Sequence, residues 1–187
     1  MQSYLTDFSI EQLNIQSLPS EIFSFFNECN QQDLTNNNSI KSIGFNKRPN
    51  EAWWVAKTNN KIISISGAHR LPFLGKNAWR VLVRSATLKE YRGKAGPFSK
   101  SLTHEFTWGH ILKHQIDYCK QHGGTEFYFT TNTVNSTVKS NEKTNKLVER
   151  ILVPQGYIKF EEQITLYDTP QNVWKIIKLP FSLDQIY

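Results

Sequence analysis

The sequence predicts an α+β domain of α/β-like character, in which a central mixed and mostly antiparallel sheet is flanked by helices. Three patterns predict it: a strand–loop–helix–strand unit, a hairpin that precedes this unit, and two strand-like runs that close the chain. They lie over residues 79–133, over residues 51–71, and over residues 158–167 with 173–179. Helical runs separate the strand-like ones, so the helices are expected to cover the sheet.

The opening segment carries one strand-like and one helical pattern. Residues 4–13 hold the first strand-like run. Residues 17–29 have apolar side chains at helical spacing, and Ser20 can cap the start of that helix. Residues 30–50 are polar and rich in Asn, which predicts a surface loop.

The clearest hairpin pattern precedes the strand–loop–helix–strand unit. Two strand-like runs, residues 53–57 and 62–66, flank a short segment that contains Asn59 and Asn60. Because Asn tolerates positive φ, this segment predicts a turn. The adjacent tryptophans of the first run are predicted to pack in the core.

The strand–loop–helix–strand unit predicts an anion-binding loop. Residues 78–88 are rich in β-branched and apolar types, and residues 89–97 then contain two glycines, a proline and three cations. Apolar residues recur at helical spacing over residues 98–122, and the pair Gly123-Gly124 predicts the end of that helix. A glycine loop between a strand and a helix gathers backbone N–H groups at the positive end of the helix dipole, which suits a pyrophosphate.

The final part of the chain predicts a second helix and two closing strands. Residues 134–153 carry an apolar face at helical spacing. Residues 158–167 and 173–179 follow as strand-like runs. Pro170 stands between these two runs, which predicts a hairpin loop there.

Length and composition predict one packed domain over residues 1–187. A hydrophobic content of 39%, with five Trp and twelve Phe, is enough for a substantial core. The two cysteines, Cys29 and Cys119, form no CxxC pair, which predicts a reducing, cytoplasmic environment without disulfides or a structural zinc. The sequence shows no signal pattern, no apolar run of membrane length and no recognisable histidine metal motif. We therefore predict neither a membrane partner nor a metal site.

The formal net charge of +6 raises the question of a nucleic-acid partner. The cations are spread along the chain without a dense run, which favours a solvated basic surface over a nucleic-acid site. A tighter group, made of Lys89, Arg92, Lys94 and Lys100, surrounds the glycine loop. That group fits a phosphorylated small molecule as well as it fits a nucleic acid.

The glycine loop carries a family resemblance. Residues 92–97, Arg-Gly-Lys-Ala-Gly-Pro, resemble the pyrophosphate loop of the GNAT N-acyltransferase superfamily. The order of the predicted elements is similar to that of a GNAT domain over roughly the whole chain. The resemblance implies a single GNAT-like acyltransferase domain, with acetyl-CoA as the cosubstrate and an amine of a small molecule or protein as the acceptor. The residues that it assigns to the cofactor are Arg92, Gly93, Lys94, Ala95, Gly96 and Asn132.

Three departures from the family pattern bear on activity. Ala95 stands where the first pattern glycine is expected, and Pro97 stands where the last Gly or Ala is expected. Leu152 stands where the family often places a Tyr that protonates the leaving thiolate. The candidate catalytic residues are therefore Tyr157, as a substitute acid, and Glu90, as a base beside the loop.

Two function classes follow from these residues, with a third behind them. The leading prediction is an acyl-CoA-dependent N-acyltransferase. The alternative is a catalytically inactive GNAT-like binding or interaction module, which the three departures favour. A basic nucleic-acid-associated protein is favoured only by the net charge.

Overall fold

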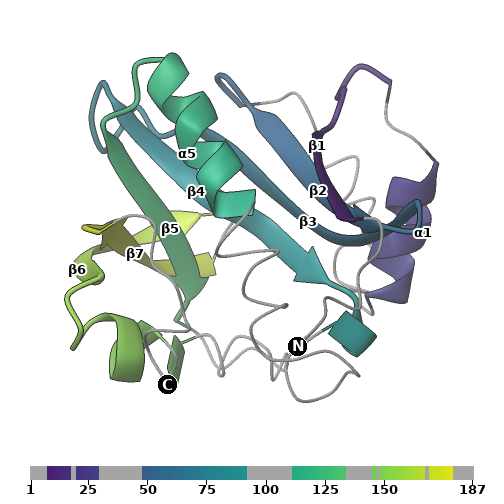
Figure 1. Ribbon diagram of the computed structural model, residues 1–187. Helices are drawn as coiled ribbons and strands as arrows, with labels where there is room; N and C mark the ends of the chain where they lie inside the picture. The colour runs from purple at the N-terminus through teal and green to yellow at the C-terminus, as the bar shows by residue number, and fades with distance from the viewer. Residues whose placement is uncertain are drawn as a thin grey trace.

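A seven-stranded mixed sheet organises the chain, with strand order β1-β2-β3-β4-β5-β7-β6 (Figure 1). The computed structural model describes residues 8–17, 20–29, 48–91, 111–133, 145–146, 148–166 and 169–178. All neighbouring strands of this sheet are antiparallel except β4 and β5, which are parallel. The predicted α+β class, with a mixed and mostly antiparallel sheet flanked by helices, is confirmed.

The described elements follow the predicted order. They are β1 (Phe8–Gln12), α1 (Glu21–Glu28), β2 (Ala52–Thr58), β3 (Lys61–Arg70), β4 (Ala78–Thr87), the 3-10 turn η1 (Lys89–Tyr91), α5 (Leu112–Gln121), β5 (Glu126–Asn132), the π-helical turn η4 (Val148–Leu152), β6 (Ile158–Leu166) and β7 (Thr169–Ile176). No helix in the described part of the chain is long and apolar enough to cross a membrane.

The predicted hairpin is formed by β2 and β3. Thr58 pairs with Lys61, so the loop has two residues, Asn59 and Asn60. Their φ angles are 48° and 60°, the paired positive values of a type I′ turn, whose twist matches that of the strands that it joins. The Asn residues therefore form the turn for the reason that predicted it.

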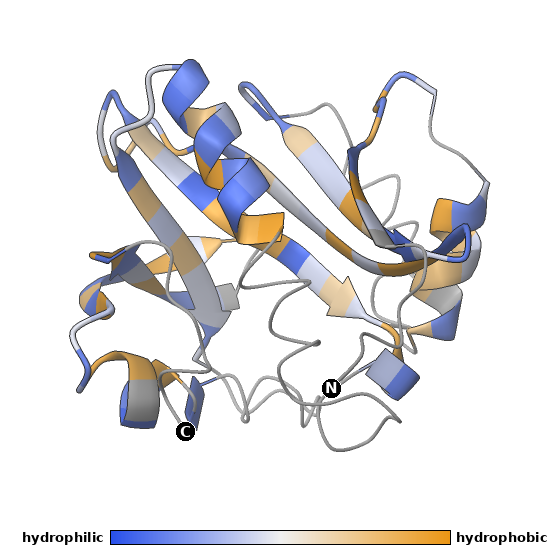
Figure 2. Cartoon of the chain, in the orientation of Figure 1, coloured by the Kyte–Doolittle hydropathy of each residue, from blue (hydrophilic) through white to orange (hydrophobic). Residues whose placement is uncertain are grey.

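Helix α5 packs against one face of the sheet, across β2, β3 and β4 (Figure 1). Leu112, Ile116 and Cys119 of its predicted apolar face are buried. Figure 2 shows hydrophilic residues on the outer side of α5 and hydrophobic residues in the strands beneath it. The helix ends as predicted, because Gly123 adopts a φ of 80° and the N–H of Gly124 donates to the Cys119 carbonyl at 2.7 Å.

The prediction for Pro170 was wrong. Pro170 lies in β7, where it pairs with Thr165, and β7 begins at Thr169 rather than at residue 173. The missing N–H of a proline is tolerated at the start of a strand. The Pro170 carbonyl is used, since it accepts hydrogen bonds from the backbone N–H of Thr133 at 3.1 Å and from its hydroxyl at 2.9 Å.

Candidate functional site

The parallel pair β4 and β5 separates soon after it begins. In this fully described pair, the paired residues are Ala78 with Glu126, Trp79 with Phe127 and Arg80 with Tyr128. Figure 1 shows the two strands close at this end and far apart at their carboxyl ends. We call the region where residues 81–87 of β4 and residues 129–132 of β5 are no longer paired the β4/β5 opening, and the last pair, Arg80 with Tyr128, its vertex. Ligands of open sheets often bind at the carboxyl ends of strands.

Strand β4 is irregular along the opening. Leu82 and Arg84 have φ angles of 54° and 51°, in the left-handed region that non-glycine residues rarely adopt. The pairing of β3 with β4 shifts register on both sides of Gly67, which marks a β-bulge. Such strained backbone persists only where its surroundings hold it, and it gathers at functional sites.

Gln115 of α5 holds this bulge from one face of the sheet. Its side chain is completely buried. Its amide nitrogen donates to the Ser66 hydroxyl at 2.9 Å and to the Gly67 carbonyl at 3.0 Å, and its amide oxygen accepts the N–H of Leu82 at 3.0 Å. One side chain thus joins the helix to both bulged strands, and both its amide nitrogen and its amide oxygen form hydrogen bonds.

A row of hydroxyl groups continues this network. The hydroxyls of Ser66 and Ser85 lie 2.8 Å apart, and Ser85 also donates to the Leu82 carbonyl at 3.1 Å. Ser64 donates to the Ala86 carbonyl at 3.0 Å. Sequence reasoning missed these residues. The signal that could have found them is a Gln on the otherwise apolar face of a helix.

The opposite face of the sheet carries polar side chains at the vertex. Trp79 packs against Tyr118 of α5, with ring centres 6.0 Å apart, so Arg80 points to the other face because strand side chains alternate. The Arg80 guanidinium donates to the Thr130 hydroxyl at 2.6 Å. That hydroxyl in turn donates to the side-chain oxygen of Gln171. These contacts bridge β4, β5 and β7 just beyond the last β4–β5 pair.

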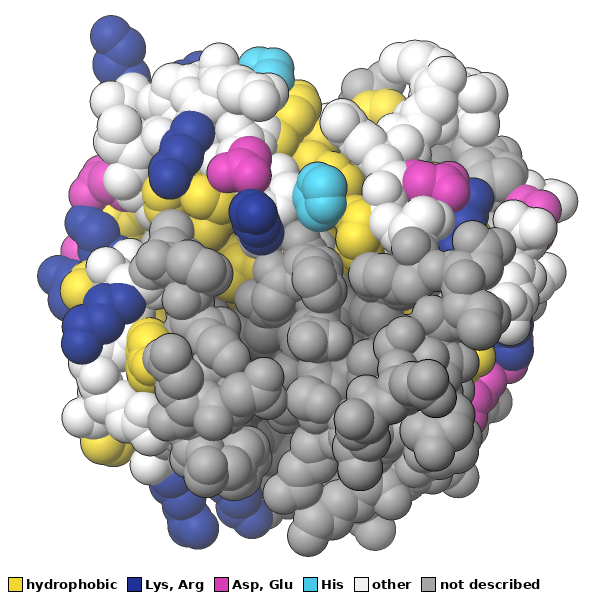
Figure 3. Space-filling view, in the orientation of Figure 1, with side chains coloured by type: hydrophobic (Ala, Val, Ile, Leu, Met, Phe, Trp, Pro, Cys, Tyr) yellow, Lys and Arg dark blue, Asp and Glu magenta, His cyan; other side chains and the backbone are white. Residues whose placement is uncertain are grey.

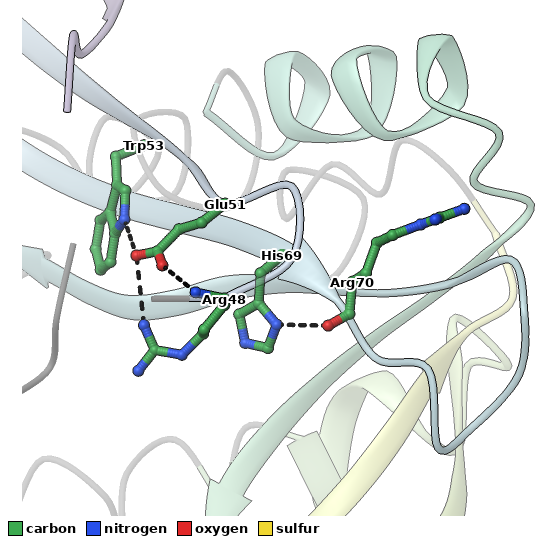
Figure 4. Close-up of polar contacts among 5 residues, drawn as sticks. All are labelled: Arg48, Glu51, Trp53, His69 and Arg70. Atoms are coloured by element: carbon green, nitrogen blue, oxygen red, sulfur yellow. Dashed lines mark hydrogen bonds and ion pairs between the residues drawn. The ribbon is translucent and has the colours of Figure 1, made fainter. Parts of the chain in front are cut away.

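A buried carboxylate, Glu51, lies directly before β2, and Figure 4 shows it with Arg48, Trp53 and His69. One carboxylate oxygen accepts the indole N–H of Trp53 at 2.6 Å, and the other accepts the backbone N–H of Arg48 at 3.2 Å. The Arg48 guanidinium is 3.3 Å from the first oxygen. The predicted core packing of the tryptophan is confirmed, since Trp53 is completely buried.

His69 of β3 belongs to the same face, because it pairs directly with Arg80. Only 5% of the residue is exposed, and Nδ1 lies 2.7 Å from the Arg70 carbonyl oxygen. Burial, together with the charges of Arg80 and Arg48, lowers the pKa of His69 from 6.5 to about 3, so the imidazole is neutral near pH 7. Nε2 is buried and has no hydrogen-bond partner in the part of the chain that the structure describes.

The predicted phosphate loop, Arg92, Gly93, Lys94, Ala95 and Gly96, lies outside the described residues. The remaining predicted cofactor residue, Asn132, ends β5 at the opening. Its carbonyl accepts a hydrogen bond from the side-chain amide of Asn145 at 2.8 Å. The Asn145 side-chain oxygen is buried and has no hydrogen-bond partner among the described residues, so an acceptor is present at this end of the opening.

Tyr157 lies directly before β6 and is half-buried against the core. Its N–H donates to the Leu152 carbonyl at 3.1 Å, and the Lys178 ammonium lies 5.7 Å from the centre of its ring. The neighbouring Ile158 pairs with Ile176, at the end of β7 that lies beside the start of β5. Tyr157 is therefore nearer to the paired end of β4 and β5 than to the opening.

Glu90 lies in η1, directly after β4. Its carboxylate is 3.4 Å from the ammonium of Lys61, which also binds Glu28 at 2.9 Å. Lys61 begins β3, so the Glu90 side chain is held on the β3 side of β4, whereas Tyr157 lies beside β7. The structure does not bring these two predicted catalytic residues together.

The described cations form no continuous basic patch on the face that carries α5. Figure 3 shows Lys and Arg side chains there interspersed with acidic, hydrophobic and uncharged ones. Ion pairs such as Lys57 with Glu11, at 2.6 Å, further divide the positive charge on the described surface.

No protein-family model and no curated protein sequence matches the chain. Several solved structures match the chain in fold. A protein from Desulfovibrio desulfuricans, described as an acetyltransferase of the GNAT family, matches with a TM-score of 0.58 and 8% identity over 90% of this chain and 98% of that one. An aminoglycoside 6′-N-acetyltransferase complexed with coenzyme A matches with a TM-score of 0.57 and 11% identity over 92% and 99%.

A third match is the Salmonella typhimurium acetyltransferase that modifies the N-terminal serine of ribosomal protein L7/L12. Its TM-score is 0.55 and its identity 10%, over 92% of this chain and 96% of that one. At these identities the likeness shows the fold. The chain thus has the fold of the GNAT acetyltransferases, as the sequence resemblance implied.

Proposed function

We propose that this chain, with its GNAT fold, is an acyl-CoA-dependent N-acyltransferase, with acetyl-CoA as the expected cosubstrate. The β4/β5 opening beside a bulged β4 is the observation that carries this proposal. A thioester bound there would lie beside the strained backbone of β4. Three buried hydrogen bonds of Gln115 fix the position of that backbone. The coenzyme A complex among the structural matches supports the same ligand class.

Two sets of residues would hold the cosubstrate. The predicted phosphate loop would bind the pyrophosphate, with Arg92 and Lys94 as its cations. Asn132 lies at the end of β5 and would hold Asn145 in place through its carbonyl. The Asn145 side-chain oxygen, which has no partner among the described residues, can then accept an amide N–H of the cosubstrate. Coenzyme A carries amide N–H groups along its pantetheine arm, and one of them could donate to the Asn145 oxygen.

The reaction transfers an acyl group from a thioester, the electrophile, to an amine, the nucleophile. The amine nitrogen forms a bond to the thioester carbonyl carbon, the carbon–sulfur bond breaks, and its electron pair leaves with sulfur. One proton passes overall from nitrogen to sulfur, so the products are an amide and a free thiol. A backbone N–H of the bulged β4 would polarise the carbonyl, and holding the amine beside the thioester would supply roughly 7–11 kcal/mol of barrier reduction at best.

Binding of acetyl-CoA is the first test, by isothermal titration calorimetry. Replacing both Arg92 and Lys94 by Ala is expected to weaken binding by about 1–3 kcal/mol, the scale of charge-assisted hydrogen bonds. The matched control replaces two exposed cations elsewhere, Lys120 and Arg150, and is expected to leave the affinity unchanged. Equal affinity of both double variants would overturn the predicted phosphate loop.

Release of free thiol in the presence of primary amines is the second test. Turnover supports the transferase, whereas binding without turnover on any amine would favour the alternative, a GNAT-like binding module. The predicted roles of Tyr157 and Glu90 are tested in the same assay with Tyr157→Phe and Glu90→Gln. A rate loss of about tenfold or more at unchanged melting temperature would support either role, and an unchanged rate would eliminate it.

A further inference from the structure

His69 has an unused hydrogen-bond acceptor that the fold does not explain. Because Nδ1 lies 2.7 Å from the Arg70 carbonyl oxygen, Nδ1 carries the proton of the neutral ring, and Nε2 presents a lone pair. Nε2 is buried, and no group in the described part of the chain donates to it. A buried polar atom without a partner costs free energy, so an unused one calls for an explanation.

The position of His69 relates this acceptor to the opening. His69 pairs with Arg80, which forms the last β4–β5 pair with Tyr128. On the same face, the Arg80 side chain reaches Thr130 of β5 across the vertex. His69 is therefore the β3 neighbour of the vertex residue Arg80, and its imidazole lies on the face opposite α5 (Figure 4).

Charge around His69 restricts what it can bind. Arg80 faces it from β4 and Arg48 from the segment before β2, where Glu51 is the neighbouring carboxylate. The same burial and the same two cations that disfavour a protonated imidazole disfavour an ammonium in contact with it. A neutral N–H donor satisfies Nε2 without adding a buried positive charge.

We propose that His69 binds the acceptor amine of the transfer reaction, with Nε2 accepting an N–H of the neutral amine, and that the acceptors are weakly basic amines such as the α-amino group of a peptide. This inference rests on the proposed function. The amine keeps its nitrogen lone pair for the thioester, because the hydrogen bond uses only an N–H. His69 orients the amine and is not the final proton acceptor.

The class of acceptor follows from amine basicity. An α-amino group has a pKa near 7.7–8.0 and a lysine side chain near 10.4, so at pH 7.5 the neutral fraction differs by roughly two orders of magnitude. The probes are an alanine-initiated tetrapeptide without Lys and its N-acetylated counterpart with one Lys. We expect kcat/KM at pH 7.5 to be roughly 100-fold higher for the free N-terminus. Preference for the lysine peptide would overturn the assigned acceptor class.

Two polar substitutions of similar size separate binding from folding. His69→Gln can place an amide oxygen near the position of Nε2, whereas His69→Asn can keep the contact with the Arg70 carbonyl but leaves nothing at Nε2. We expect His69→Asn to raise the KM for the tetrapeptide about tenfold, the scale of one hydrogen bond, and His69→Gln to stay within about threefold. The affinity for acetyl-CoA should stay within about twofold in both.

The outcomes distinguish this inference from the proposed function. A parent protein that turns over while His69→Asn keeps the parent KM would overturn the role of His69 alone. So would an equal rise of KM in both variants. If the parent binds CoA but does not turn over, calorimetric titration of CoA-saturated protein with the tetrapeptide makes the same comparison. Equal affinity of parent and His69→Asn in that titration would overturn the role of His69, independently of the failed transferase proposal.

Discussion

Two buried polar side chains near the β4 bulge, Gln115 and His69, lie on opposite faces of the sheet and differ in how fully they are hydrogen-bonded. Gln115, on the α5 face, makes three hydrogen bonds to Ser66, Gly67 and Leu82. His69, on the opposite face, uses Nδ1, and its buried Nε2 has no hydrogen-bond partner among the described residues. A fully satisfied network rigidifies a fold, whereas an unused acceptor has hydrogen-bonding capacity for a ligand. The difference is between a residue that supports the fold and a residue that we propose binds the acceptor amine.

Removing the Gln115 amide should have the largest effect on stability. Gln115→Leu keeps the volume of the side chain but leaves the N–H of Leu82 and the carbonyl of Gly67 buried without this partner. At about 1–3 kcal/mol for each orphaned group, we expect the free energy of unfolding to fall by about 3–4 kcal/mol. Urea denaturation measures it.

Gln121→Leu is the matched control, since it makes the same change at the exposed end of the same helix. We expect the free energy of unfolding to change there by no more than about 0.5 kcal/mol. Similar values for the two variants would mean that the α5 face does not depend on its buried network.

The contribution of His69, on the opposite face, to the free energy of unfolding should depend on pH. The pKa of His69 is about 3 in the folded protein and near 6.5 when unfolded, so the unfolded chain binds the additional proton between these values. Stability on account of His69 is therefore complete above about pH 6.5 and falls as the pH decreases toward 3. Between pH 7.5 and 4.5 we expect a loss of about 2–3 kcal/mol.

His69→Gln removes this titrating group and should reduce the stability difference between pH 7.5 and 4.5 by that amount, as measured by urea denaturation at each pH. The same substitution at the exposed His114 of α5 controls for the change of residue type. An undiminished difference in His69→Gln would show that other groups carry the acid sensitivity.

The exposed ion pairs of Lys61, at the start of β3, should contribute least to stability. Lys61 contacts Glu28 at 2.9 Å and Glu90 at 3.4 Å, but about half of each side chain is accessible to solvent. We expect Lys61→Ala to lower the free energy of unfolding by no more than about 1 kcal/mol, and added 0.5 M NaCl to reduce that effect. A larger loss that salt does not change would assign the contribution to packing of the Lys61 stem.

The local elements could be predicted because their signals are local. Asn59 and Asn60 predict a turn through their tolerance of positive φ, and Gly123 predicts a helix end in the same way. Pro170 shows the limit of such reasoning. It was predicted in a loop, yet it is the second residue of strand β7, where its carbonyl accepts hydrogen bonds from Thr133, which is distant in sequence.

The sequence by itself determined the order of strands and helices, the turn residues and the apolar face of α5, because hydrophobic spacing and backbone preferences act between near neighbours. It also led to the GNAT resemblance through the loop at residues 92–97. Only the tertiary structure decided that Gln115 supports the bulge and that His69 is the β3 neighbour of the vertex residue Arg80. These contacts join residues on different strands and helices, and their register depends on bulges whose positions no local spacing specifies.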